Sequence, residues 1–138
     1  MKTGRLNAGA GLITMAVFMA YGFLLIYLRD FHPDKEAWIA AYGIGKHFEA
    51  RLAHVHGNLF GMLNLIIAFV LVKLTVAPER CRKVVAWTGV IGILMPFGIL
   101  AEIYLGLPPI LVLIGALSMT VSVGLAGVMS FKFWGKEV

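Results

Sequence analysis

The sequence predicts an all-α membrane protein, a bundle of four transmembrane helices in a single domain. Of its 138 residues, 60% are hydrophobic and 14% are charged, whereas a soluble domain is about half apolar and about a quarter charged. Four apolar stretches reach the ~20 residues that a helix needs to cross a bilayer. The net charge of +5 comes from basic residues at the ends of these stretches. Charges placed there orient a membrane protein and do not form the basic stripe of a nucleic-acid-binding protein.

The first two predicted helices cover residues 8–28 and 54–74. The first carries no charge and follows Lys2 and Arg5, as a signal peptide would. It is too long for a signal peptide and lacks a small-x-small cleavage site, so we expect it to be retained. The second begins at His54, and its residues 54–72 include no Lys, Arg, Asp or Glu.

The last two predicted helices cover residues 84–105 and 108–131. Glu102 is the only charged residue in the first of them, and the second has none. The link between them is short, because Pro108 and Pro109 can occupy the first turn of a helix. Residues 29–53 form the one long connection, with charged and aromatic side chains. Within it, residues 37–42 and 45–53 are predicted to form a short interfacial helix leading into the second span.

The distribution of Lys and Arg predicts the orientation of the bundle. Eight lie at the termini and in residues 73–83, and four lie in the 29–53 connection. By the positive-inside rule, both termini are cytoplasmic and the long connection faces outward. We expect the bacterial or archaeal cytoplasmic membrane, with any site near the outer side.

Polar residues inside a membrane are costly and therefore mark candidate functional sites. The stretch KHFEARLAHVHGNLFGMLN, residues 46–64, holds three of the four histidines. At about 100° per residue, His54 shares a helix face with Gly57, Asn58 and Gly61, whereas His56 points away from it. The Gly-x-x-x-Gly spacing permits close helix approach, and a glycine face beside His54 also predicts room for a flat macrocycle.

Glu102 is predicted to lie at a depth similar to that of His54, since the third helix runs outward and the second returns. With Tyr21 and Tyr27 at the outer end of the first helix, the outer half of the bundle collects histidine, carboxylate and phenol groups. The inner half is expected to be almost purely apolar. A site built from these groups would be reached from the outer face.

Inward histidines in a four-helix membrane bundle suit a haem or a metal ion. We predict haem b with His54 as axial ligand, and Asn58 or Arg51 bonded to the second ring nitrogen or to a propionate. The full set of candidate cofactor-binding residues is His54, His56, His47, Asn58, Arg51, Gly57 and Gly61. The alternative is copper or zinc bound by imidazole and carboxylate ligands, from His54, His56, His47 and Glu102.

The run LAHVHGNLFGMLNLIIAFV resembles the second transmembrane helix of haem-copper oxidase catalytic subunits and of the related nitric oxide reductases. In that family a histidine near the outer face ligates the low-spin haem, and His54 matches it. His56, Asn58 and Gly61 match the positions that follow. The family draws further histidines from later helices for the second haem ligand and for copper, and here those helices have none. The resemblance therefore implies no oxygen reduction by this chain alone.

A second haem ligand has two possible sources. His47 or His32 would have to fold over the site, or a homodimer through the second helix would supply a histidine from its partner. Three functions remain open at this point: a haem protein for electron transfer, sensing or haem handling, a copper- or zinc-binding protein or assembly factor, and a structural subunit of a respiratory-type complex. No serine–histidine–acid pattern, phosphate loop or nucleotide fingerprint predicts a catalytic residue. The single Cys81 forms no internal disulfide.

Overall fold

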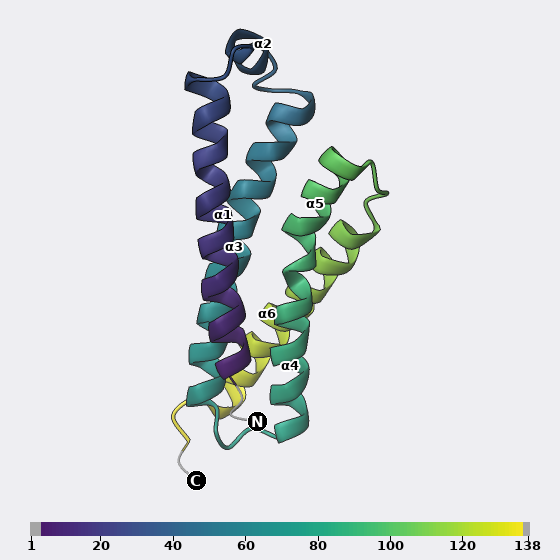
Figure 1. Cartoon of the computed structure of the whole chain (residues 1–138). Coiled ribbons are helices and arrows are strands. Elements are labelled where there is room, and N and C mark those ends of the chain that lie inside the picture. The colour runs from purple at the N-terminus through teal and green to yellow at the C-terminus, as the bar shows by residue number, and fades with distance from the viewer. Residues whose placement is uncertain (1–3, 137–138) are drawn as a thin grey trace.

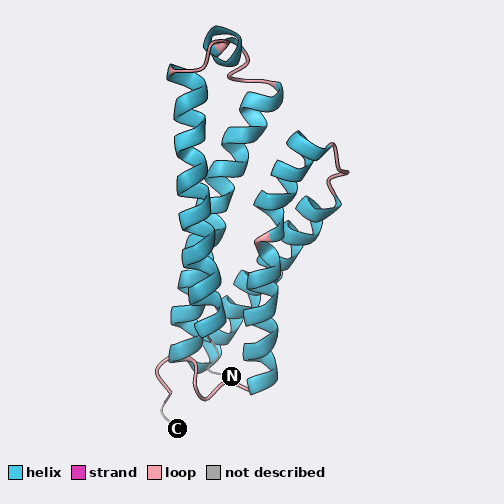
Figure 2. Cartoon of the chain, viewed as in Figure 1, coloured by secondary structure: helices cyan, strands magenta, loops and turns pink. Residues whose placement is uncertain are grey.

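The computed structural model describes residues 4–136 and is all-α, as predicted (Figures 1 and 2). Strands are absent from this range. Lys2, which counted toward the predicted orientation, lies outside the described residues. The helices are α1 (Arg5–Asp30), α2 (Lys35–Ala40), α3 (Gly45–Lys73), α4 (Glu79–Gly92), α5 (Leu94–Leu105) and α6 (Ile110–Phe133).

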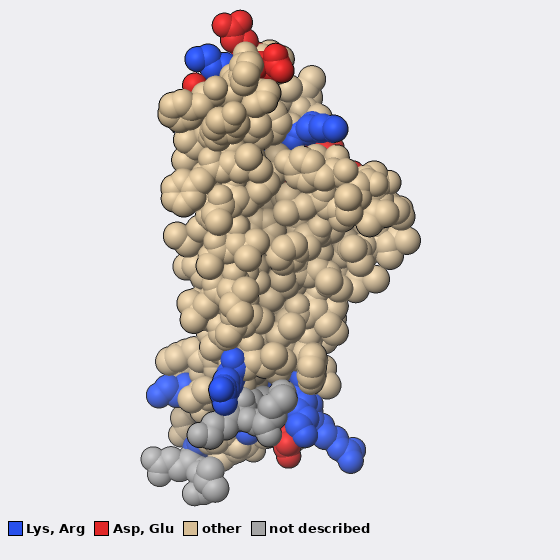
Figure 3. Space-filling model, viewed as in Figure 1, with Lys and Arg blue, Asp and Glu red and all other residues tan. Residues whose placement is uncertain are grey.

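Four helical segments are long and apolar enough to cross a membrane, so the chain is an integral membrane protein. They are Arg5–Asp30, Gly45–Lys73, Glu79–Leu105 and Ile110–Phe133. In Figure 3, charged side chains gather toward the two ends of the molecule and an uncharged band separates them. We call the end that carries α2 the loop end, and the end that carries both described chain ends the terminal end (Figure 1).

Helix α3 is longer than the sequence predicted. It begins at Gly45, whose positive φ of 60° favours glycine, and it includes residues 45–53, which were expected in an interfacial segment. Its 29 residues span about 43 Å at ~1.5 Å each, more than the ~30 Å hydrocarbon core. The α1–α3 pair therefore extends past α5 and α6 at the loop end (Figure 1), and only the short α2 remains as a separate helix there.

The third span, predicted as one helix, is two. Helix α4 ends at Gly92 and α5 begins at Leu94. Pro96 explains the break, because its nitrogen carries no hydrogen for the carbonyl of Gly92 and its ring crowds the preceding turn. At the far end of α5, Gly106 adopts the left-handed conformation with φ 64° and closes the helix before the turn into α6.

Helix α3 packs closely on α1 through its glycines, as the Gly-x-x-x-Gly spacing predicts. A methyl group at Gly57 would lie 2.1 Å from the ring of Phe18, and one at Gly61 would lie 2.5 Å from the side chain of Met15. Phe18 is fully buried, between this contact and the ring of Phe97, whose centre lies 5.1 Å away. The glycine face is therefore filled by α1, and the expectation that it leaves room for a macrocycle was wrong.

The expectation of an almost purely apolar half at the terminal end was also wrong. Asn7, Asn64 and Ser122 are fully buried there, because their helices turn these polar side chains toward one another and away from lipid. Together they tie α1, α3, α4 and α6. The Nδ2 of Asn7 donates to Asn64 Oδ1 (2.8 Å) and to the carbonyl of Ala86 (2.9 Å), the Nδ2 of Asn64 donates to the carbonyls of Gly89 (2.9 Å) and Phe60 (3.0 Å), and the Oγ of Ser122 donates to the carbonyl of Val85 (2.7 Å).

Candidate functional site

His54 is held between α3 and α1. Its ring is partly buried, and its Nδ1 lies 2.8 Å from the backbone carbonyl oxygen of Phe18. A carbonyl oxygen only accepts, so Nδ1 carries a proton, and the tautomer this selects for the neutral ring has its lone pair on Nε2. Gly22 of α1 makes room for the ring, since a methyl group at Gly22 would lie 2.7 Å from Cε1 of His54. The backbone of α1 thus sets both the tautomer and the position of the imidazole.

The ring of His54 borders an apolar groove on the surface of α1. The groove has a volume of about 400 Å³ and is otherwise lined by Met19, Gly22, Phe23, Leu25 and Ile26. All five belong to α1 and lie in its apolar stretch. An imidazole lone pair at the edge of such a groove can bind a metal in an apolar cofactor or accept a hydrogen bond from a lipophilic ligand.

His56 faces the other side of α3, as the helical spacing predicts. Its Nδ1 bonds the carbonyl of Leu52 in the same helix at 2.9 Å. The ring borders a separate groove of about 540 Å³ between α3, α5 and α6, where Met95 and Met119 also lie. His54 and His56 therefore belong to two different surfaces of a single chain.

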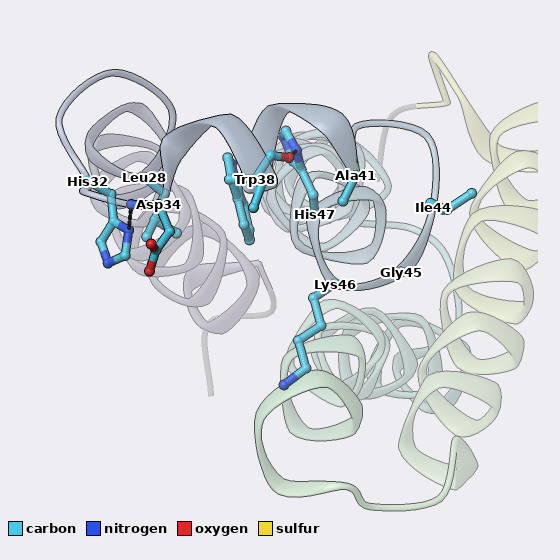
Figure 4. A pocket seen from close by; sticks show the side chains of 10 residues that line it. Leu28, His32, Asp34, Trp38, Ala41, Ile44, Gly45, Lys46 and His47 are labelled. Atoms are coloured by element: carbon cyan, nitrogen blue, oxygen red, sulfur yellow. Dashed lines mark hydrogen bonds between the residues drawn. The ribbon is translucent and has the colours of Figure 1, made fainter.

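His47 is enclosed at the loop end and faces neither groove. Its ring stacks on Trp38, with centroids 4.3 Å apart, and Tyr42 meets its edge at 5.3 Å. The Nδ1 of His47 bonds the carbonyl of Trp38, and Figure 4 shows the two side chains next to each other. These contacts fasten α2 onto the start of α3. His32 lies apart from them, with its Nδ1 accepting the backbone N–H of Asp34 at 3.1 Å (Figure 4).

Asn58 and Arg51 make other contacts than those predicted for them. The side chain of Asn58 donates to the backbone carbonyl of His54 at 2.9 Å and not to its imidazole ring. The guanidinium of Arg51 lies 3.6 Å from the ring centre of Tyr42 and donates to the Tyr42 carbonyl at 3.2 Å. The ring nitrogen of His54 that was predicted to bond Asn58 or Arg51 instead bonds the backbone of α1.

The predicted copper or zinc ligands lie apart. Glu102 is exposed on α5, His47 is enclosed by aromatic rings, and His54 and His56 point to different grooves. Within residues 4–136, no three His, Cys, Asp or Glu side chains come close enough to hold a metal ion together. A non-haem site made from this set would need more than one chain.

Phe18 and Gly22 are the site residues that sequence reasoning missed. Both lie on α1, more than thirty positions before His54, and neither carries a functional group of its own. One signal was present: Gly11 and Gly22 are three turns apart at ~3.6 residues per turn, so they mark one face of α1. Both would clash with α3 if they carried a methyl group.

Comparisons of the chain with protein-family models, with curated proteins and with solved structures gave no match. The resemblance of residues 52–70 to an oxidase helix accordingly stands on its motif alone.

Proposed function

We propose that this membrane protein binds a b-type haem, with Nε2 of His54 as an axial ligand. The observation that carries the proposal is the hydrogen bond from Nδ1 of His54 to the carbonyl of Phe18. Metal-ligating histidines usually donate their other N–H to a carbonyl or carboxylate, which fixes the tautomer and the ring orientation. His54 already has this arrangement, beside an apolar groove.

The groove that His54 borders suits a flat, largely apolar cofactor lying along the surface of α1. Gly22 keeps the ring close to α1, and Met19 and Phe23 line an apolar wall that would exclude water. When bound, a haem would supply one-electron chemistry whose potential depends on its axial ligands and on its burial. The chain itself supplies the first imidazole and fixes its direction through the carbonyl of Phe18.

A homodimer through α3 would cover the open side of this groove and supply the second ligand. Helix α3 exposes an apolar stripe at alternating spacings of four and three, the repeat of a helix–helix seam. At about 100° per residue, the stripe lies between the directions of His54 and His56. A partner packed along it would bring the partner's His54 or the partner's His56 near either groove. The stripe consists of Val55, Leu59, Met62, Ile66 and Phe69.

Absorption spectra of the detergent-purified protein test this proposal. Protein from haem-supplied cells is expected to show a Soret band and sharp bands on reduction, and His54→Ala is expected to lose them. His54→Asn is the variant that separates ligation from folding, because an amide can still donate to Phe18 but does not replace an imidazole. His47→Ala is the control, since His47 is engaged with Trp38.

Two outcomes would contradict the proposal. One is a wild-type spectrum without haem bands, which would leave a structural role in a larger complex as the better account. The other is a His54→Asn variant with unchanged bands, which would remove His54 as a ligand. Size-exclusion chromatography and helix content of each variant identify any loss of bands that results from misfolding.

A further inference from the structure

A third groove lies at the terminal end of the bundle, between the start of α4 and the end of α6. Its volume is about 370 Å³. Arg80 and Lys132 line it close to the ends of α4 and α6, and the apolar Val84, Leu125 and Met129 line it farther along the two helices. The groove thus runs from two cations at the ends of membrane-crossing helices toward the part of the bundle that faces hydrocarbon.

The two cations of this groove are not neutralised by a carboxylate of the described residues, and the ammonium of Lys132 lies 5.4 Å from the ring centre of Phe133. Within residues 4–136, neither Arg80 nor Lys132 forms an ion pair. Glu79, the carboxylate in the same turn, is already paired with Lys83 at 2.7 Å. The first turn of α4 adds backbone N–H groups that have no partner within the helix, which favours phosphate. Lys and Arg side chains also gather at this end of the molecule (Figure 3).

We propose that this groove binds an anionic phospholipid, with the phosphate at Arg80 and Lys132 and an acyl chain along Val84, Leu125 and Met129. Basic pockets between transmembrane helices bind anionic headgroups in this way. The apolar residues of the groove favour a lipid over a free phosphate, because an acyl chain can pack against them and a free phosphate cannot. The site lies at the opposite end of the bundle from α2 and does not depend on haem binding.

Cys81 provides the test, because it lines the groove and is the only cysteine of the chain. Its rate of alkylation by N-ethylmaleimide would be measured in nanodiscs of phosphatidylcholine alone and of phosphatidylcholine with phosphatidylglycerol. Bound lipid is expected to slow alkylation severalfold in the mixed nanodiscs. Arg80→Gln and Lys132→Gln should each raise the phosphatidylglycerol fraction needed for half protection about fivefold, the effect of one cation at an anionic surface.

Two controls separate a bound lipid from a general effect of surface charge. Lys73→Gln removes a charge from the same end of the bundle but not from the groove, and it should leave the protection of Cys81 unchanged. Thr75→Cys in a Cys81→Ser background places the thiol at an exposed position outside the groove, where phosphatidylglycerol should protect it little.

Three results would overturn the proposal. The first is that Lys73→Gln and Arg80→Gln need the same phosphatidylglycerol fraction for half protection of Cys81. The second is that inorganic phosphate slows the alkylation of Cys81 in phosphatidylcholine nanodiscs. The third is that alkylation of Cys81 is equally fast in nanodiscs with and without phosphatidylglycerol. Native mass spectrometry gives a readout that does not use the thiol: the wild-type protein should retain phosphatidylglycerol in preference to phosphatidylcholine, and the Arg80→Gln/Lys132→Gln double variant should not.

Discussion

Single polar residues in the apolar core define how the helices of this protein meet. Asn64 joins three helices, since its amide bonds Asn7 of α1 and the carbonyl of Gly89 in α4. In a membrane, an amide that loses its partner has no water to replace it. The same amide on a lipid-facing position would be costly, so the buried pair also selects the register in which α1, α3 and α4 pack.

Replacing Asn64 with leucine should destabilise the protein by about 1–2 kcal/mol, because it leaves one N–H of Asn7 and the carbonyl of Gly89 unpaired. Asn58→Leu is the matched control, because Asn58 bonds only within its own helix and its loss should cost much less. Unfolding by a denaturing detergent in mixed micelles measures both. An equal loss in the two variants would show that the interhelical bonds contribute nothing.

Gly22 should be required for ligand binding at His54. In Gly22→Ala, the new methyl group would lie 2.7 Å from Cε1 of His54, so the ring must move and its bond to Phe18 must lengthen. We expect a weaker Soret band or a changed spin state, with the helix content unchanged. Gly9→Ala on the same helix meets nothing within 4 Å and should leave the spectrum as in the wild type. Identical spectra for the two variants would contradict this role of Gly22.

At the scale of helices, hydropathy was a sufficient guide to which segments form and cross the membrane, but not to where they end. Helix α3 begins nine residues before its predicted start, because residues 45–53 are largely polar and yet continue the same helix beyond the hydrocarbon core. The break between α4 and α5 follows from Pro96. Whether a proline interrupts a membrane helix depends on whether neighbouring helices satisfy the carbonyl group that it leaves without a hydrogen bond, and the sequence does not show this. Helix periodicity alone separated His54 from His56 correctly.

The α1–α3 contact should be the least tolerant of added volume. In Gly57→Ala, the methyl group would meet the ring of Phe18 at 2.1 Å, and the buried ring has nowhere to go. Overpacking of this kind costs about 1–3 kcal/mol. Gly127→Ala on α6 is the control, since its methyl group meets nothing within 4 Å. The free energies of unfolding compare them, and a Gly57→Ala variant as stable as Gly127→Ala would refute the packing model.

At the scale of the whole molecule, the excess of basic residues at the terminal end predicts its orientation. Cys81 lies at that end, so a membrane-impermeant maleimide added to intact cells should leave it unlabelled. Gly43→Cys in a Cys81→Ser background puts the thiol in the exposed connection near α2, where the reagent should label it. The reverse labelling pattern would invert the bundle and place His54 near the cytoplasmic side.

The whole arrangement also shows why the site was only half predictable. His54 was identifiable as a polar residue on an otherwise apolar helix, since such positions are rare. Its partner is a backbone carbonyl, that of Phe18, which every residue possesses and no sequence pattern marks. The role of Gly57 and Gly61 depended on which helix covers them, and only the packing of α1 against α3 decides that.

Imidazole rescue of a His54→Gly variant tests the central claim, ligation by His54, most directly. The variant purified from haem-supplied cells should lack the Soret band, and added haem with free imidazole should restore it, because the small ligand can fill the space left beside Gly22. His47→Gly should need no rescue. A His54→Gly variant that keeps the wild-type spectrum without imidazole would contradict ligation by His54.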